Sequence, residues 1–70
     1  MITTKDIGKQ FTFGSRIVTL EGLETFKTHA HPLGRLDAWV HDPNTPNPAN
    51  IPGLEYFWVN LDDLTPVEGN

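Results

Sequence analysis

The sequence predicts a single all-β domain with five short strands, and three observations lead to this prediction. Apolar and polar residues alternate with a period of two in several short segments, which is typical of strands with one buried face. Turns rich in glycine, proline and asparagine separate these segments. The chain has only 70 residues and no cysteine, so residues 1–70 form one domain with a small core and no disulfide bonds.

The first predicted elements are a single helical turn and a short strand. Thr3 or Thr4 can cap the turn, and Gly8 can end it because glycine adopts the left-handed conformation without a steric penalty. Residues 10–13 then place two phenylalanines on one side, which predicts the first strand. Gly14 and the serine after it supply the turn that leads into the second strand.

The second and third strands flank a turn that contains proline and glycine. Residues 16–20 are rich in β-branched side chains, and the strand can continue to residue 26 across a bulge or bend at Gly22. In the turn that follows, Pro32 fixes φ and Gly34 allows a positive φ. The third strand is predicted over residues 35–41.

Proline alternates with asparagine in residues 43–53, which predicts a long exposed loop. Connections between paired strands usually have about 2 to 5 residues, so this loop is either a functional excursion or a mobile insertion. A fourth strand, a short 3₁₀ turn and a short last strand follow the loop. Their predicted ranges are 55–61 for the fourth strand, 62–64 for the turn and 65–67 for the fifth strand, with 68–70 as a frayed tail.

Five short strands in so few residues fit a small barrel better than a sandwich, because closing the sheet removes exposed edges from a small core. Two segments, which read DIGK at residues 6–9 and WVNLDDLTP at residues 58–66, resemble the opening and closing segments of small SH3-like barrel proteins. Many such proteins are encoded by bacteriophages and mobile elements. The resemblance implies a five-stranded SH3-like barrel with a 3₁₀ turn before the last strand, and a role in modulating a host protein.

Charge and composition exclude several classes of function. The net charge is −4, and most acidic residues lie in the second half, where Arg35 is the only cation. Phosphate binding needs clustered lysine and arginine, so nucleic acid is an unfavourable partner. An acidic surface favours basic protein partners. The sequence has no cysteine, no signal peptide and no apolar run near the roughly 20 residues that cross a bilayer, which predicts a cytoplasmic protein, in the host cytoplasm if phage-encoded.

The catalytic and metal-binding signals are weak. His29 and His31 lie two residues apart, and His41 or Asp42 could supply a third ligand, but a turn with two solvated histidines is the commoner arrangement. The single serine lies in a turn and not in a nucleophile elbow. The two aspartates that precede Leu64 are better explained as caps of the 3₁₀ turn. We therefore predict no catalytic residue, no metal site and no cofactor.

Outward aromatic side chains are the strongest functional feature of the sequence. The alternation places Trp39, Tyr56 and Trp58 on the face opposite the apolar residues of their strands, and Asp37 and Glu55 would add an acidic rim. Either the proline-rich loop or the C-terminal tail covers these rings, or they form an open binding surface. The scarcity of bulky residues in and beside the loop favours the open surface. The predicted buried face comprises Leu36, Ala38, Val40, Phe57, Val59 and Leu61.

These features predict a non-enzymatic interaction module that binds a protein partner, such as a host protein, through the aromatic surface. One alternative is a structural or oligomerisation module, in which the same surface pairs copies of the chain or fits into a larger assembly such as a virion. A less favoured alternative is a barrel that binds single-stranded nucleic acid by base stacking.

Overall fold

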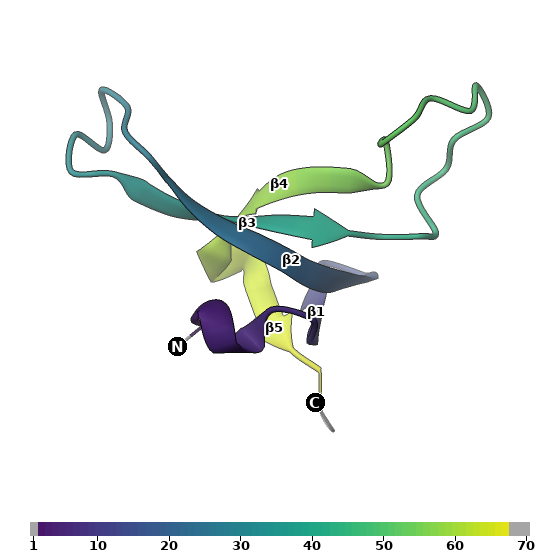
Figure 1. Cartoon of the computed structure of the whole chain (residues 1–70), viewed down its shortest axis with the longest axis horizontal. Coiled ribbons are helices and arrows are strands. Elements are labelled where there is room, and N and C mark those ends of the chain that lie inside the picture. Colours follow the sequence, from purple (N-terminus) through teal and green to yellow (C-terminus); the bar gives the residue numbers. More distant parts are fainter. Residues whose placement is uncertain (1, 68–70) are drawn as a thin grey trace.

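The computed structural model describes residues 2–67, and within them the chain folds into one five-stranded antiparallel sheet with two single-turn 3₁₀ helices (Figure 1). The strand order is β4-β3-β2-β1-β5. The all-β prediction is therefore confirmed, while the tail at 68–70 lies outside the described residues. The elements are η1 (Thr4–Asp6), β1 (Gln10–Phe13), β2 (Arg16–Phe26), β3 (Arg35–His41), β4 (Tyr56–Asn60), η2 (Leu61–Asp63) and β5 (Leu64–Pro66).

The sheet is open, with β4 and β5 as its two edges, so the pairings do not form the closed barrel expected from the sequence. The long strand β2 connects the two halves of the sheet, because residues 16–19 pair with β1 and residues 19–26 pair with β3. A bulge between Leu20 and Gly22 interrupts the second pairing, at the glycine where the sequence predicts a bend. Bulges increase the local twist of a strand, and in Figure 1 β1 and β5 lie below the plane of β3 and β4.

The core lies on the concave side of the sheet, between the β2–β3–β4 part and the β1–β5 part. Three of the six residues predicted to be buried are so, namely Ala38, Val40 and Val59. Phe57 and Leu61 pack against the core as half-buried neighbours. The prediction for Leu36 is wrong, because β3 extends toward the β2–β3 turn beyond the core and leaves this side chain exposed. The buried core comprises Phe11, Val18, Leu20, Ala38, Val40, Val59 and Leu64.

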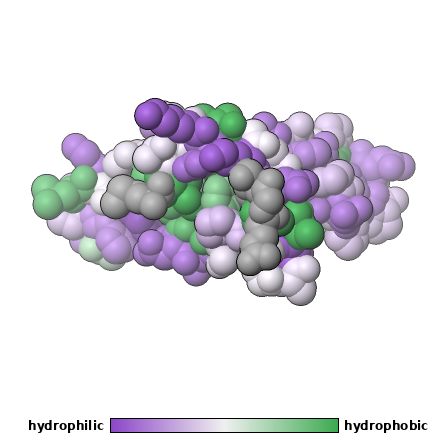
Figure 2. All heavy atoms as spheres, turned by 90° about the horizontal axis from the view of Figure 1, so that it is seen from below, coloured by the Kyte–Doolittle hydropathy of each residue, from purple (hydrophilic) through white to green (hydrophobic). Residues whose placement is uncertain are grey.

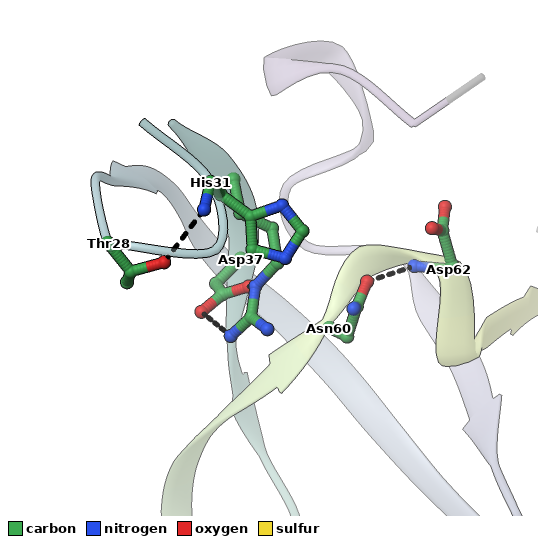
Figure 3. Close-up of polar contacts among 6 residues, drawn as sticks. Thr28, His31, Asp37, Asn60 and Asp62 are labelled. Atoms are coloured by element: carbon green, nitrogen blue, oxygen red, sulfur yellow. Dashed lines mark hydrogen bonds and ion pairs between the residues drawn. The ribbon is translucent and has the colours of Figure 1, made fainter. Parts of the chain in front are cut away.

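Side-chain caps begin both 3₁₀ helices. At η1 the cap is Thr3, whose Oγ1 accepts a hydrogen bond from the Lys5 N–H, while its own N–H donates to Asp6. That donation, together with Lys9, lowers the pKa of Asp6. At η2 the cap is Asn60, whose Oδ1 accepts from the Asp62 N–H at 2.9 Å (Figure 3). The sequence assigned this role to the carboxylates of η2, which are instead exposed.

The proline-rich loop between β3 and β4 extends away from the sheet (Figure 1). Its own contacts hold it, since the Asn47 side chain exchanges two 2.8 Å hydrogen bonds with the backbone of Ile51. The base of the loop is attached to β2 through Arg16, which donates to Asp42 and Thr45 at 2.7 Å each. In residues 2–67, no helix has the length and apolar character needed to cross a membrane.

Candidate functional site: an aromatic face on the convex side of the sheet

Five rings lie in contact across three strands on the sheet face opposite the core, and we call this surface the aromatic face. Its rings contact one another in a chain, in which neighbouring centroids are 4.4 to 6.0 Å apart. The three distances between pairs of phenylalanine, tyrosine and tryptophan rings, 4.9 to 6.0 Å, fall within the range in which aromatic pairs attract one another beyond simple burial. The chain of rings runs, in order of contact, through His41, Tyr56, Trp39, Trp58 and Phe26.

Strand register explains why these rings meet. Trp39 lies directly opposite Trp58, and His41 lies directly opposite Tyr56, in the β3–β4 pairing. Residues directly opposite in an antiparallel pair share a face of the sheet, so the four side chains form two adjacent cross-strand pairs. Gly22, opposite Trp39 on β2, leaves that side of the indole free of a side chain.

The aromatic face is open in the described structure. Trp58 keeps 45% of its surface exposed and Tyr56 keeps 37%, whereas Trp39 is half-buried between them. The proline-rich loop therefore does not seal these rings. The structure places all three aromatic residues predicted from the sequence on one surface.

Phe26 was missed by sequence reasoning as a member of this surface, although its strand was predicted. Its ring makes an edge-to-face contact with Trp58 at 5.0 Å. The bulge at Glu21 and Gly22 shifts the alternation of β2 by one residue. The face of the sheet on which Phe26 lies can therefore be assigned only once the position of the bulge is known.

Asp37 does not form the exposed acidic rim expected from the sequence. Phe26 lies opposite Arg35, and Trp58 lies opposite Trp39, so the contact between the two rings spans β3 at Asp37. This side chain is only 7% exposed, and both of its carboxylate oxygens accept hydrogen bonds from Arg35, at 2.9 and 3.0 Å (Figure 3). Arg35 and Asp37 thus form a neutral bidentate pair at the edge of the aromatic face.

The surroundings of the Arg35 guanidinium favour its charged form. Hydrogen bonding to Asp37 raises the pKa of the Arg35 guanidinium, and the nearby charges of Asp37 and Asp63 act in the same direction. Charge-assisted bidentate pairs of this kind are among the stronger side-chain interactions. The pair was foreseeable, because residues two apart in a strand lie on the same face.

Glu55, the other predicted rim residue, immediately precedes β4. Its backbone carbonyl accepts a 2.8 Å hydrogen bond from the Asp42 N–H, which extends the β3–β4 ladder by one pair. No ion pair involving its carboxylate occurs in residues 2–67. The exposed Asp62 likewise has no cationic partner in that part of the chain, so each end of β4 carries an acidic residue without an ion pair.

A groove on the opposite side of the molecule was not predicted. It has a volume of about 840 Å³ and opens where the sheet fails to close, between η1, β5 and η2. Figure 2 shows this side, with hydrophobic residues in the middle of the surface. The lining combines core residues with two carboxylates and one ammonium group; it includes Phe11, Leu36, Leu61, Leu64, Asp6, Asp62 and Lys9.

The histidines do not assemble a metal centre in the described structure. Within residues 2–67 there is no group of three or more histidine, cysteine, aspartate or glutamate side chains that could hold a metal ion. His31 instead belongs to the β2–β3 turn, where its N–H donates to the hydroxyl of Thr28 at 3.1 Å (Figure 3). His41 contributes its ring to the aromatic face.

Comparison with known proteins finds no similarity on which an assignment could rest. No known protein family, curated protein or solved structure matches the chain. The aromatic face and its surroundings therefore carry the functional argument.

Proposed function

We propose that this chain is a small protein-interaction module that binds a protein partner through the aromatic face, without catalysing a reaction. The observation that carries the proposal is the exposure of Trp58 and Tyr56 within a continuous layer of rings. Tryptophan and tyrosine are enriched at binding hot spots, because they bury a large area at a low cost in conformational entropy.

The contacts between the rings and the charges near them are suited to a binding surface. Contacts from three strands hold Trp39 and Trp58 in place, so little side-chain entropy is lost when a partner binds. The Arg35–Asp37 pair neutralises one acid beside the rings, whereas Glu55 and Asp62 leave the two ends of β4 acidic on the core side of the strand. A partner with apolar and basic residues complements this surface.

The proposal includes an SH3-like architecture and a role as a modulator of a host protein. The five strands, the bulged β2 and the 3₁₀ turn before β5 support the first part. The second part rests on the resemblance of residues 6–9 and 58–66 to proteins often encoded by bacteriophages. In that setting, the module would act in the cytoplasm of the host cell by occupying a surface of a host protein.

A selection of displayed random peptides on the immobilised protein, followed by fluorescence anisotropy of the enriched peptides, tests the proposal. We expect the Trp39→Ala, Trp58→Ala double variant to bind at least about tenfold more weakly, because truncating a hot-spot residue costs about 2 kcal/mol or more. Leu33→Ala is the matched control, since Leu33 is a large apolar residue that is 94% exposed outside the aromatic face.

The fold of each variant is checked by the dispersion of its amide NMR spectrum. If the double variant does not fold, the single variant Trp58→Gln replaces it, because this side chain is already half-exposed. Unchanged binding by a folded Trp58 variant would contradict the proposal.

Self-association is the second candidate, and one observation favours it: β4 is an uncharged strand at an open edge of the sheet. Sedimentation of the wild type over a hundredfold range of concentration separates the two candidates. A stable dimer that Trp58→Gln dissociates would replace the partner-binding proposal with self-assembly.

A further inference from the structure

One hydrogen bond shows which residues of β4 direct their backbone groups toward β3 and which direct them toward the open edge. Asp42 donates its N–H to the carbonyl of Glu55, and the β3–β4 register makes these residues direct opposites. In an antiparallel pair, bonded and non-bonded opposites alternate along the strands. Phe57 and Val59 therefore bond to β3, whereas Tyr56, Trp58 and Asn60 direct their backbone N–H and C=O groups toward the open edge.

Some of these outward groups are already occupied. The N–H of Tyr56 donates to the carbonyl of Gly53 at 3.1 Å. The N–H and C=O of Trp58, the C=O of Tyr56 and the N–H of Asn60 remain directed to the side on which the sheet has no further strand. Trp58 thus offers both a donor and an acceptor, next to a side chain that belongs to the aromatic face.

The two edges of the sheet differ in how they are protected. At the other edge, the N–H of Val67 donates to the carbonyl of Gln10, so the same alternation directs Leu64 and Pro66 outward. Proline has no N–H, and β5 has only three residues, so this edge is poorly suited to pairing. Strand β4, which reads YFWVN, contains neither proline nor a charged residue.

We infer that the β4 edge is a strand-addition site for an extended segment of a partner protein, with an apolar residue opposite Trp58 and basic residues at both ends. This inference rests on the proposed function and specifies its binding mode. A residue that bonds to Trp58 in an antiparallel pair places its side chain on the same face as the indole. Backbone pairing and packing on the aromatic face therefore occur together.

The charges that flank β4 define the ends of the partner segment. Glu55 precedes the strand and Asp62 follows it, and neither has an ion pair among the described residues. A strand of this length spans about 17 Å, so an added strand would bring its two ends near these carboxylates. Lysine or arginine at both ends would complement them.

A second copy of the chain fits this edge less well than a basic segment. If two β4 strands paired antiparallel about Trp58, Glu55 of one copy would lie next to Asp62 of the other, and each copy carries a net charge of −4. Like charges that face each other across an interface disfavour association.

Backbone methylation of a synthetic peptide tests the inference directly. The probe is a nine-residue peptide that alternates valine and threonine and has lysine at both ends. With its valines on the aromatic face, the valine N–H groups point toward β4 and the threonine N–H groups point away. We expect N-methylation of the valines to weaken binding at least about tenfold, because backbone hydrogen bonds are lost. N-methylation of the threonines is the matched control.

Two further measurements accompany the titration. In the complex with the unmethylated peptide, hydrogen exchange at the backbone amide of Trp58 is expected to slow, which packing on the indole alone would not produce. Glu55→Gln and Asp62→Asn are expected to weaken binding several-fold at low salt and much less at high salt.

The outcomes separate the inference from the proposed function. Equal loss of binding with either methylation pattern, or no binding of the unmethylated peptide, would overturn strand addition, while the selected peptides would still test the aromatic face. If Trp58→Gln bound those peptides like the wild type, the proposed function itself would be wrong. Slow exchange of the Trp58 amide in the free protein, together with a dimeric mass, would assign the edge to a second copy.

Discussion

Asp42 connects the two halves of the chain through its carboxylate. It is 3% exposed, and one oxygen accepts from the Nε of Arg16 at 2.7 Å while the other accepts from the Asn44 N–H at 2.9 Å. Arg16 also lies 4.6 Å from the ring centroid of Phe57, which adds a cation–π contact. Burial alone would raise the pKa of Asp42, but these hydrogen bonds outweigh burial and leave the pKa below its ordinary value of 3.8.

This lowered pKa predicts a pH dependence of stability. A carboxyl group with a lower pKa in the folded state stabilises the fold above its unfolded pKa, near 3.8, and loses that contribution as the pH falls through the folded value. The difference in unfolding free energy between wild type and Asp42→Asn should therefore shrink below about pH 4. Urea unfolding from pH 7 to pH 2.5 measures it, with the exposed Asp62→Asn as control. A difference in unfolding free energy that stays constant over this pH range would contradict the lowered pKa of Asp42.

At the scale of the elements, the β2–β3 hairpin determines where the aromatic face lies. The bulge at its centre shifts the alternation of β2, and the turn at its end contains Gly34 with a φ of +101°. An added Cβ at Gly34 would lie 2.5 Å from the Cγ2 of Thr25, whereas one at Gly22 would meet only the Cβ of Trp39 at 3.8 Å. The two glycines therefore have different roles, although both interrupt the same hairpin.

Alanine at these two positions should have opposite effects. Gly22→Ala is expected to be neutral or to stabilise by about 0.4–1 kcal/mol, because alanine restricts the unfolded chain and makes an ordinary contact. Gly34→Ala is expected to destabilise by more than about 1 kcal/mol, because of its positive φ and the close approach of Thr25. Thermal unfolding of both variants checks this, and equal midpoints would contradict it.

The whole molecule has a small core and correspondingly limited stability. Seven buried hydrophobic residues form the core in the described part of the chain. A protein of this length has a total stability of about 4–10 kcal/mol. The exposed rings and the open β4 edge add surface that the core does not cover, and a binding partner could stabilise the chain by covering it.

Truncation of a central core residue should therefore remove a large part of the total stability. Leu20→Ala is expected to cost about 2–5 kcal/mol, because this side chain is fully buried. Leu33→Ala removes the same atoms from an exposed position and should change stability by less than about 0.5 kcal/mol. Urea unfolding followed by circular dichroism compares the two variants. A cost below 1 kcal/mol for Leu20→Ala would show that the core is assigned wrongly.

Much of the fold and part of the site were accessible from sequence because they depend on local periodicity. The pleat of a strand fixes which side chains share a face, so Trp39, Tyr56 and Trp58 could be assigned to one face of the sheet and Ala38 and Val40 to the other. Turn chemistry likewise located the bulge at Gly22 and the 3₁₀ helix before β5. These features need no knowledge of which strands pair.

Other features were decided only by the tertiary structure, because they depend on contacts between distant parts of the chain. The contact of Phe26 with Trp58 spans three strands, and Asp37, a predicted rim acid on the strand between them, is instead the buried partner of Arg35. Strand order determines that the sheet is open, and strand register determines which backbone groups of β4 point toward the open edge. Periodicity assigns side chains to faces, but only long-range pairing determines which faces meet and which backbone groups remain free.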